Sequence, residues 1–199
     1  MTHSKTEEMP MKRMIVLLMS LIALCLFTGC GPKGDTPTDK RQLVQTMKQE
    51  TLEDLYTFHP AAKQSVANSI GYAVFSNTGI NLLLLSTGNG YGVAHDNATG
   101  KETYMRMFTA GVGIGLGVKD FRGIFIFSTQ EAFDTFVEQG WQAGAQADAA
   151  AKAGEKGGAA DSAIDVAPGV ELYQLTKNGL ALQATIQGTK YWKDDELNN

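Results

Sequence analysis

The residue best placed for chemistry is Cys30, whose thiol ends the run Phe27-Thr28-Gly29-Cys30. Small residues at the two positions before a cysteine are what the lipoprotein signal peptidase requires of its substrate. Lys12 and Arg13 precede an uncharged stretch of about 14 residues, which is shorter than the roughly 20 that span a bilayer. We therefore predict a signal peptide over residues 1–29, cleavage before Cys30, and attachment of N-palmitoyl and S-diacylglycerol groups to this cysteine.

The residues around this site predict where the mature chain is held. Glu7 and Glu8 make an unusual prefix for a signal peptide, so Met11 is an alternative start. The residues after Cys30 read GPKGDTPT and offer nothing to bury, which predicts a flexible tether over residues 30–38. Gly31 is not the Asp that retains lipoproteins in the inner membrane under the enterobacterial sorting rule. In an organism with two membranes, we expect the periplasmic face of the outer membrane.

The remaining residues do not assemble a familiar catalytic or metal site. Cys30 is the only thiol left after cleavage, so neither a disulfide nor a thiolate metal site can form. His59 stands before a proline and His95 beside a predicted turn, and we interpret both as solvated loop residues. The run Asp194-Asp195-Glu196 reads as a solvated tail. No nucleophile, base and orienting group come together, and we expect no enzyme activity, no cofactor and no metal.

The tempting motif is a ladder of alternate glycines at Gly111, Gly113, Gly115 and Gly117. A dinucleotide-binding loop needs its third glycine at the sixth position, where this chain has Leu116, followed by another strand. The alternation instead predicts a strand with one bare face, which lets another element approach its backbone closely. We interpret the ladder as structural. A groove for a lipid chain is the alternative.

Charge and length narrow the class of protein. The chain has 17 basic and 21 acidic residues, and removal of residues 1–29 leaves 14 and 19. A mildly acidic domain without a basic cluster lacks the electrostatic footprint of a nucleic-acid-binding protein. The roughly 170 mature residues are enough for one domain, which we assign to residues 39–199.

Periodicity predicts two helices and then a sheet. Thr38 or Asp39 can cap an amphipathic helix that ends near Tyr56, and a second helix covers residues 61–67. The first helix can pack on the core or lie on a membrane surface. Apolar runs then predict strands at 72–75, 80–85, 90–96, 101–109, 111–118 and 124–127. Residues 97–100 form a hairpin turn, and 131–139 form a helix.

The C-terminal part is less uniform. Residues 141–158 are rich in Ala and Gly and fit either a helix or a strand, and 154–162 read as an exposed loop. Residues 170–176 and 180–187 flank Asn178-Gly179, which predicts a second hairpin with a type I′ turn. A mostly antiparallel sheet with flanking helices results.

The order of several short motifs resembles the SYLF-domain family of lipid-binding modules. The motifs are Gly71-Tyr72-Ala73-Val74-Phe75, Gly90-Tyr91-Gly92-Val93, Ala110-Gly111-Val112-Gly113, an Ala/Gly-rich stretch after Trp141, and Gly179-Leu180. The resemblance covers residues 38–197. It implies a single α+β domain whose mostly antiparallel sheet is barrel-like or strongly curved, with a strand over residues 141–152.

The resemblance also suggests what the domain binds. Family members in eukaryotes contact phosphoinositides through a basic N-terminal segment, and Lys40, Arg41 and Lys48 are the matching positions here. We therefore expect a membrane-anchored envelope lipoprotein with a lipid-binding module for phospholipid or phosphoinositide-type headgroups. Actin binding by some relatives is not carried over, because a bacterial envelope holds no actin. The alternative is a structural or protein-interaction lipoprotein that has an envelope partner and no lipid ligand.

Overall fold

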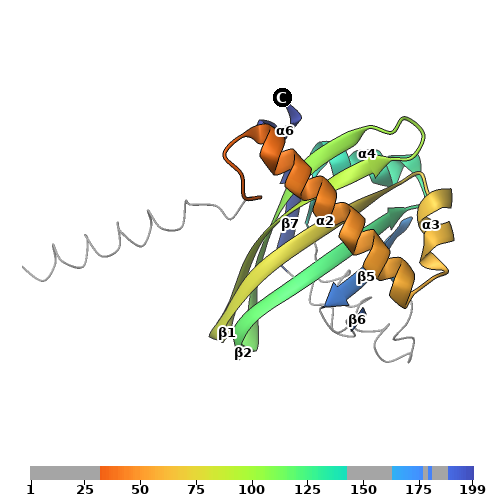
Figure 1. The fold of residues 1–199 in the computed structure, drawn as a ribbon. Coiled ribbons are helices and arrows are strands. Elements are labelled where there is room, and N and C mark those ends of the chain that lie inside the picture. Colours follow the sequence, from red (N-terminus) through yellow and green to blue (C-terminus); the bar gives the residue numbers. More distant parts are fainter. Residues whose placement is uncertain (1–31, 143–162, 177–178, 181–187) are drawn as a thin grey trace, which may run out of the picture. The chain divides into compact units, whose positions relative to one another are not determined.

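The computed structural model describes residues 32–142, 163–176, 179–180 and 188–199. The described helices are α2 (Pro37–Phe58), α3 (Ala62–Asn68), α4 (Gln130–Gln139) and α6 (Asp195–Asn198). The strands are β1 (Gly71–Asp96), β2 (Glu102–Phe127), β3 (Trp141–Gln142), β4 (Ile164–Ala167), β5 (Val170–Thr176), β6 (Gly179–Leu180) and β7 (Thr189–Lys193). Gly31–Asn199 form one compact unit. The predicted α+β fold with a strongly curved antiparallel sheet is confirmed (Figure 1).

The sheet is built on two very long strands. β1 and β2 pair antiparallel from Gly71↔Phe127 to His95↔Glu102, with one register shift between Leu83 and Leu85. The segments predicted as six short strands do lie in strands, but they merge into two continuous ones because no proline or turn interrupts either β1 or β2. A register shift lets a ribbon bend without ending its pairing. β5 and β7 extend the sheet along β2, β4 pairs with β5, and β3 pairs with β7.

Both long strands run toward one end of the molecule and come back (Figure 1). Two glycines in the returning part of β1 make this possible. A Cβ at Gly92 would lie 2.3 Å from the carbonyl oxygen of Val74, and one at Gly90 would lie 2.4 Å from that of Ser76. Any larger residue would separate the two halves of β1.

The sheet is buried on both faces, which explains its continuous apolar runs. Tyr72 and Val74 face a core cluster beneath α2 and α3, whereas Ala73 and Phe75 face a second cluster beneath α4. The same alternation recurs further along the sheet, where Ile124, Ile126 and Tyr173 join the first cluster and Phe125, Phe127 and Leu172 join the second. Successive residues of a strand point to opposite faces, so a run with no polar residues serves two cores.

Helix α2 packs on the core, which decides between the two alternatives for it. Val44 and Leu55 are fully buried, and Met47 is 5% exposed. The helix begins two residues earlier than predicted because its cap is Thr36. The Thr36 hydroxyl accepts from the Asp39 amide at 3.1 Å, and the Asp39 carboxylate accepts from the Thr36 amide at 3.1 Å. This reciprocal capping box, with Pro37 in the first turn, fixes where the helix starts.

The predicted hairpin between β1 and β2 is confirmed, with residues 97–101 as its connection. Asp96 accepts hydrogen bonds from the amides of Ala98 at 2.8 Å and Thr99 at 3.0 Å, and Gly100 takes a φ of +72°. These backbone hydrogen bonds, led by the one from Thr99, hold the pKa of Asp96 below its ordinary value. The turn is therefore specified by its own side chains.

Of the other predictions, some are confirmed and some concern residues outside the described part. Helices α3 and α4 are confirmed close to the expected residues. In the second predicted hairpin, Leu175 and Thr176 pair with Leu180 and Gly179. Residues 177–178 and 181–187 lie outside the described residues. Of the strand predicted over 141–152, Trp141 and Gln142 are described and form β3. The signal peptide, Cys30 and the loop at 154–162 also fall outside.

Candidate functional site

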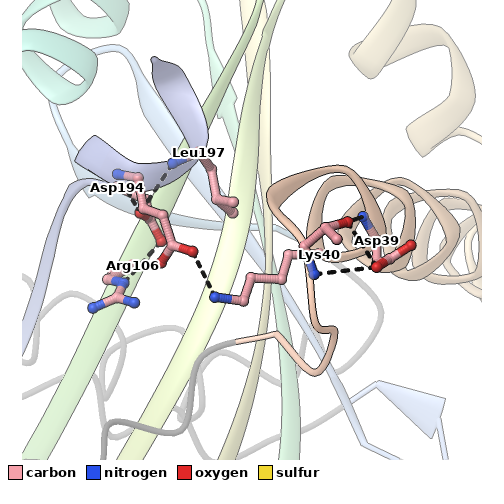
Figure 2. Close-up of polar contacts among 7 residues, drawn as sticks. Asp39, Lys40, Arg106, Asp194 and Leu197 are labelled. Atoms are coloured by element: carbon pink, nitrogen blue, oxygen red, sulfur yellow. Dashed lines mark hydrogen bonds and ion pairs between the residues drawn. The ribbon is translucent and has the colours of Figure 1, made fainter.

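The first two predicted headgroup contacts lie at the start of α2 and bind the end of the chain. Lys40 Nζ is 2.6 Å from Glu196 Oε1 on α6. Arg41 donates from Nε to the Leu197 carbonyl at 2.8 Å and from Nη2 to the Asn199 carbonyl at 2.7 Å. In Figure 2, Lys40 extends from α2 toward α6. Both cations therefore have partners inside the fold.

The α6 segment is anchored by a buried carboxylate. Asp194 is 3% exposed and accepts from the amides of Glu196 at 3.0 Å and Leu197 at 3.3 Å, which makes it the N-cap of α6. Its second oxygen lies 2.8 Å from Nε of Arg106 on β2 (Figure 2). The interpretation of residues 194–196 as a solvated tail was wrong. Asp194 is instead a helix cap, for which Asp is a preferred residue, and Glu196 pairs with Lys40.

The third predicted contact, Lys48, belongs to a polar cluster between α2 and the hairpin. Glu102 Oε1 lies 2.6 Å from Lys48 Nζ and 2.7 Å from His95 Nδ1. Lys48 is only 9% exposed, and the His95 ring packs against Tyr72 with centroids 5.0 Å apart. We name these three residues, Lys48, Glu102 and His95, the hairpin cluster. His95 is thus a partly buried residue whose ring is hydrogen-bonded to Glu102, and its interpretation as a solvated loop residue was wrong.

His59 is also held by the fold. Its ring lies 5.4 Å from that of Tyr173 and is half-buried at the end of α2. Within the described residues, no three His, Cys, Asp or Glu side chains are grouped closely enough to hold a metal ion. Nor does any helix of the described part have the length and apolar character to cross a membrane.

The four glycines of the ladder all lie in β2, opposite the middle of β1. Gly111 pairs with Ser86, Gly115 with Leu83 and Gly117 with Asn81. The register shift of the β1–β2 pair falls within this stretch. The expectation that the ladder is a bare structural face stays a prediction.

A pocket lies beside α4. It has a volume of about 410 Å³. Its lining comes from the end of β2, the first turns of α4, β3 and the β4–β5 connection: Phe127, Thr129, Glu131, Ala132, Thr135, Phe136, Trp141, Ala167, Pro168, Gly169 and Val170. This volume falls within the range of about 300–1,000 Å³ that is usual for small-ligand sites.

The buried side of the pocket, which we call its floor, is aromatic. The Phe136 ring packs at a tilt against Phe127, with a centroid distance of 5.0 Å, and against Trp141, at 6.5 Å. Behind them, Tyr191 is fully buried and lies 5.7 Å from Phe136. Burial raises the pKa of the Tyr191 phenol, so this wall stays neutral. Apolar walls with hydroxyl groups at the rim suit an alkyl chain better than a polar metabolite.

The fold defines a class of protein: a small α+β domain that encloses a curved antiparallel sheet between helices, here with a pocket beside α4. The chain belongs to the SYLF-domain family, since residues 108–199 match the family described as "Ysc84: Las17-binding protein actin regulator". It is also 37% identical over 162 residues to "Beta cell expansion factor A" of Aeromonas veronii. The alignment covers 81% of this chain and 60% of that relative. The predicted resemblance is confirmed.

Sequence reasoning missed the pocket and the polar partners of α2. One signal was available for the pocket, because Phe133, Phe136 and Val137 mark the inner face of α4 and thus place Trp141 near it. No signal pointed to Glu102 or Asp194 as partners of Lys48 and Arg106. Their separations of 54 and 88 residues leave no local pattern.

Proposed function

We propose that this chain is a lipid-anchored protein of the cell envelope whose folded domain binds a lipid-type amphiphile in the pocket beside α4. The pocket is the observation that supports this function. Its floor offers the aromatic surface of Phe127, Phe136 and Trp141, and its rim offers the hydroxyls of Thr129 and Thr135. Such a site can hold an alkyl chain with its head at the opening.

The geometry favours this pocket over the N-terminal helix as the lipid contact. Lys40, Arg41 and Lys48 are each within 2.8 Å of an oxygen of this same domain. A phosphate group would have to replace these partners. For Lys48 it would also have to enter a site where the side chain is only 11% exposed. Headgroup binding by these cations would therefore cost the ion pairs of Lys40 and Lys48 and the hydrogen bonds of Arg41.

The names of the relatives give less support to a function for this chain than the pocket does. The family description refers to Las17 binding and actin regulation, and the bacterial relative is named for beta cell expansion. A protein anchored at the periplasmic face of an outer membrane would meet neither actin nor an actin regulator. We therefore extend neither name to this chain.

The pocket is tested with residues 31–199, the compact unit, purified from cells and analysed by mass spectrometry for bound lipid. Thr135→Phe places a ring at the pocket rim and is expected to weaken lipid binding by about tenfold or more. Asp134→Phe adds the same ring to α4 outside the pocket lining and should bind as the unmodified domain does. Lipid-free protein that also ignores neutral and anionic vesicles would favour the structural or protein-interaction alternative.

The anchor is tested separately through Cys30. Replacement of Cys30→Ser in the full chain is expected to abolish both cleavage of residues 1–29 and the added mass of the diacylglycerol and palmitoyl groups. Fractionation of the envelope should find the chain that keeps Cys30 with the outer membrane. A Cys30→Ser chain that is still cleaved and lipidated would contradict the proposed anchor. A Cys25→Ser variant is the matched control and should mature normally.

We also propose that the domain is not an enzyme. In the described part of the chain, the polar partner of His95 is Glu102, and no Ser or Thr hydroxyl is hydrogen-bonded to this ring. A hydrolase that acts through a serine or threonine nucleophile needs such a contact between the hydroxyl and its base. Esterase and phospholipase assays on the purified domain are expected to stay at background. Turnover abolished by His95→Gln would refute this.

A further inference from the structure

We propose that the pocket beside α4 selects an amphiphile whose head carries an ammonium group and discriminates against anionic heads. This inference rests on the proposed lipid function and names the ligand class of that site. It departs from the expectation of an anionic headgroup on α2, because the charges at the pocket have the opposite sign.

The charge at the pocket comes from Glu131. It is exposed in the first turn of α4, and among the described lining residues it is the one with a formal charge. Charged groups that the structure describes on and beside α4 do not offset it. The Asp134 carboxylate accepts from the side-chain Nε2 of Gln130 at 2.9 Å, and Lys193 is within 3.1 Å of Glu138. An ammonium head at the rim therefore has a carboxylate to pair with.

The first turn of α4 opposes the attraction of an ammonium head, because the N–H groups at a helix start attract anions. One hydrogen bond and a comparison of charges indicate that the Glu131 carboxylate has the larger effect. Thr129 already accepts from the Ala132 amide at 3.3 Å, so one of these donors is satisfied. The helix end is equivalent to about half a positive charge, whereas the Glu131 carboxylate carries a full negative one. The net field at the rim is negative.

The hydroxyls at the rim fit the same ligand. Thr135 lies one turn after Glu131 on α4, and the two line the same opening. An ammonium with up to three N–H donors can bond to a carboxylate and a hydroxyl together. The alkyl chain of the ligand then lies against Phe136 and Trp141. An ethanolamine-type lipid head or a long-chain amine has this chemistry.

The test uses Trp141 as a reporter. The chain has two tryptophans, so Trp192→Phe in residues 31–199 leaves Trp141 alone. The probes share a 12-carbon chain and differ in the head: dodecylammonium, lauroyl lysophosphatidylethanolamine and dodecanoate, each at neutral pH and below its micellar concentration. Fluorescence of Trp141 is expected to shift to shorter wavelength with all three. The two amine-bearing probes should bind tighter than dodecanoate, by up to about fivefold for an exposed ion pair.

Matched variants test the preference for an ammonium head separately from lipid binding itself. Glu131→Gln should remove the preference, Glu131→Lys should reverse it, and Asp134→Asn should leave it unchanged. Tighter binding of dodecanoate, or an unchanged preference in Glu131→Gln, would overturn the ammonium selection while leaving lipid binding intact. A Trp141 signal that responds to none of the probes would overturn both. Preference for dodecylammonium over the ethanolamine lipid would identify a free amine as the ligand source.

Discussion

The ammonium of Lys48 on α2 and the carboxylate of Glu102 on β2 lie 2.6 Å apart at the hairpin end of the sheet. Lys48 occupies the buried side of the helix together with Val44, Met47 and Thr51. The pair therefore ties α2 to the hairpin, and its carboxylate also binds His95. The sequence predicted that Lys48 contacts a lipid headgroup, whereas in the structure it pairs with Glu102.

Loss of the Glu102 carboxylate should destabilise the domain. Glu102→Gln leaves Lys48 as a nearly buried charge without a counterion, and we expect a cost of roughly 2 kcal/mol, below that of a fully buried pair. Urea unfolding followed by circular dichroism measures it. Lys101→Gln, an exposed neighbour, is the control and should change the free energy of unfolding by less than about 0.5 kcal/mol. Equal midpoints for both variants would show that the hairpin cluster contributes nothing to stability.

Arg41 should matter for stability and not for lipid binding. Arg41→Gln removes the hydrogen bonds to the carbonyls of Leu197 and Asn199, and we expect the unfolding free energy to fall by about 1 kcal/mol. Affinity for the pocket ligand should stay the same. Cosedimentation with phosphatidylglycerol vesicles provides the opposing test. If Arg41→Gln releases the domain from these vesicles while stability is preserved, the headgroup role assigned to α2 is correct.

Replacement of Asp194 should destabilise the domain far more than replacement of Asp195. Asp194→Ala removes the N-cap of α6 and the partner of Arg106, so we expect a loss of about 2 kcal/mol. Asp195 is exposed in the first turn of α6, and Asp195→Ala should cost less than about 0.5 kcal/mol. Thermal unfolding of both variants distinguishes a structural cap from a solvated acidic tail, because a tail predicts no difference between them.

Alkaline pH should destabilise the domain through its buried tyrosines. Burial, with smaller contributions from Glu102 and Tyr56, raises the pKa of Tyr72 to about 12. In the unfolded chain this phenol ionises near pH 10. Its folded pKa is the higher one, so its contribution to stability is complete below pH 10 and is lost as the pH rises toward 12. We expect a fall of about 2 kcal/mol from this residue.

Tyr72→Phe provides the check on that window. Urea midpoints at pH 8, 10 and 11.5 should fall less steeply in Tyr72→Phe than in the unmodified domain. Tyr191 has a raised pKa for the same reason, so the double variant with Tyr191→Phe should be flatter still. Parallel curves for all the proteins would mean that other groups cause the alkaline loss.

Much of the fold could be predicted because its signals are short-range. The turn at Asp96–Gly100, the inner face of α4 and the alternating motifs of the sheet each depend on residues within one or two turns of each other. The Cys30 prediction has the same local character and awaits its own test. Family membership also followed from these motifs, because their order along the chain persists even when each one is weak.

The sequence by itself determined which residues are apolar, where turns fall and which family the chain joins. Only the tertiary structure decided that β1 and β2 double back as continuous strands, since the contact of Gly92 with Val74 depends on the bend of the whole ribbon. It also decided the partners of Lys48, Arg41 and Asp194, which join elements that are distant in the chain. Ion pairs and pockets form between segments that are distant in the chain, and such contacts leave no local pattern in the sequence.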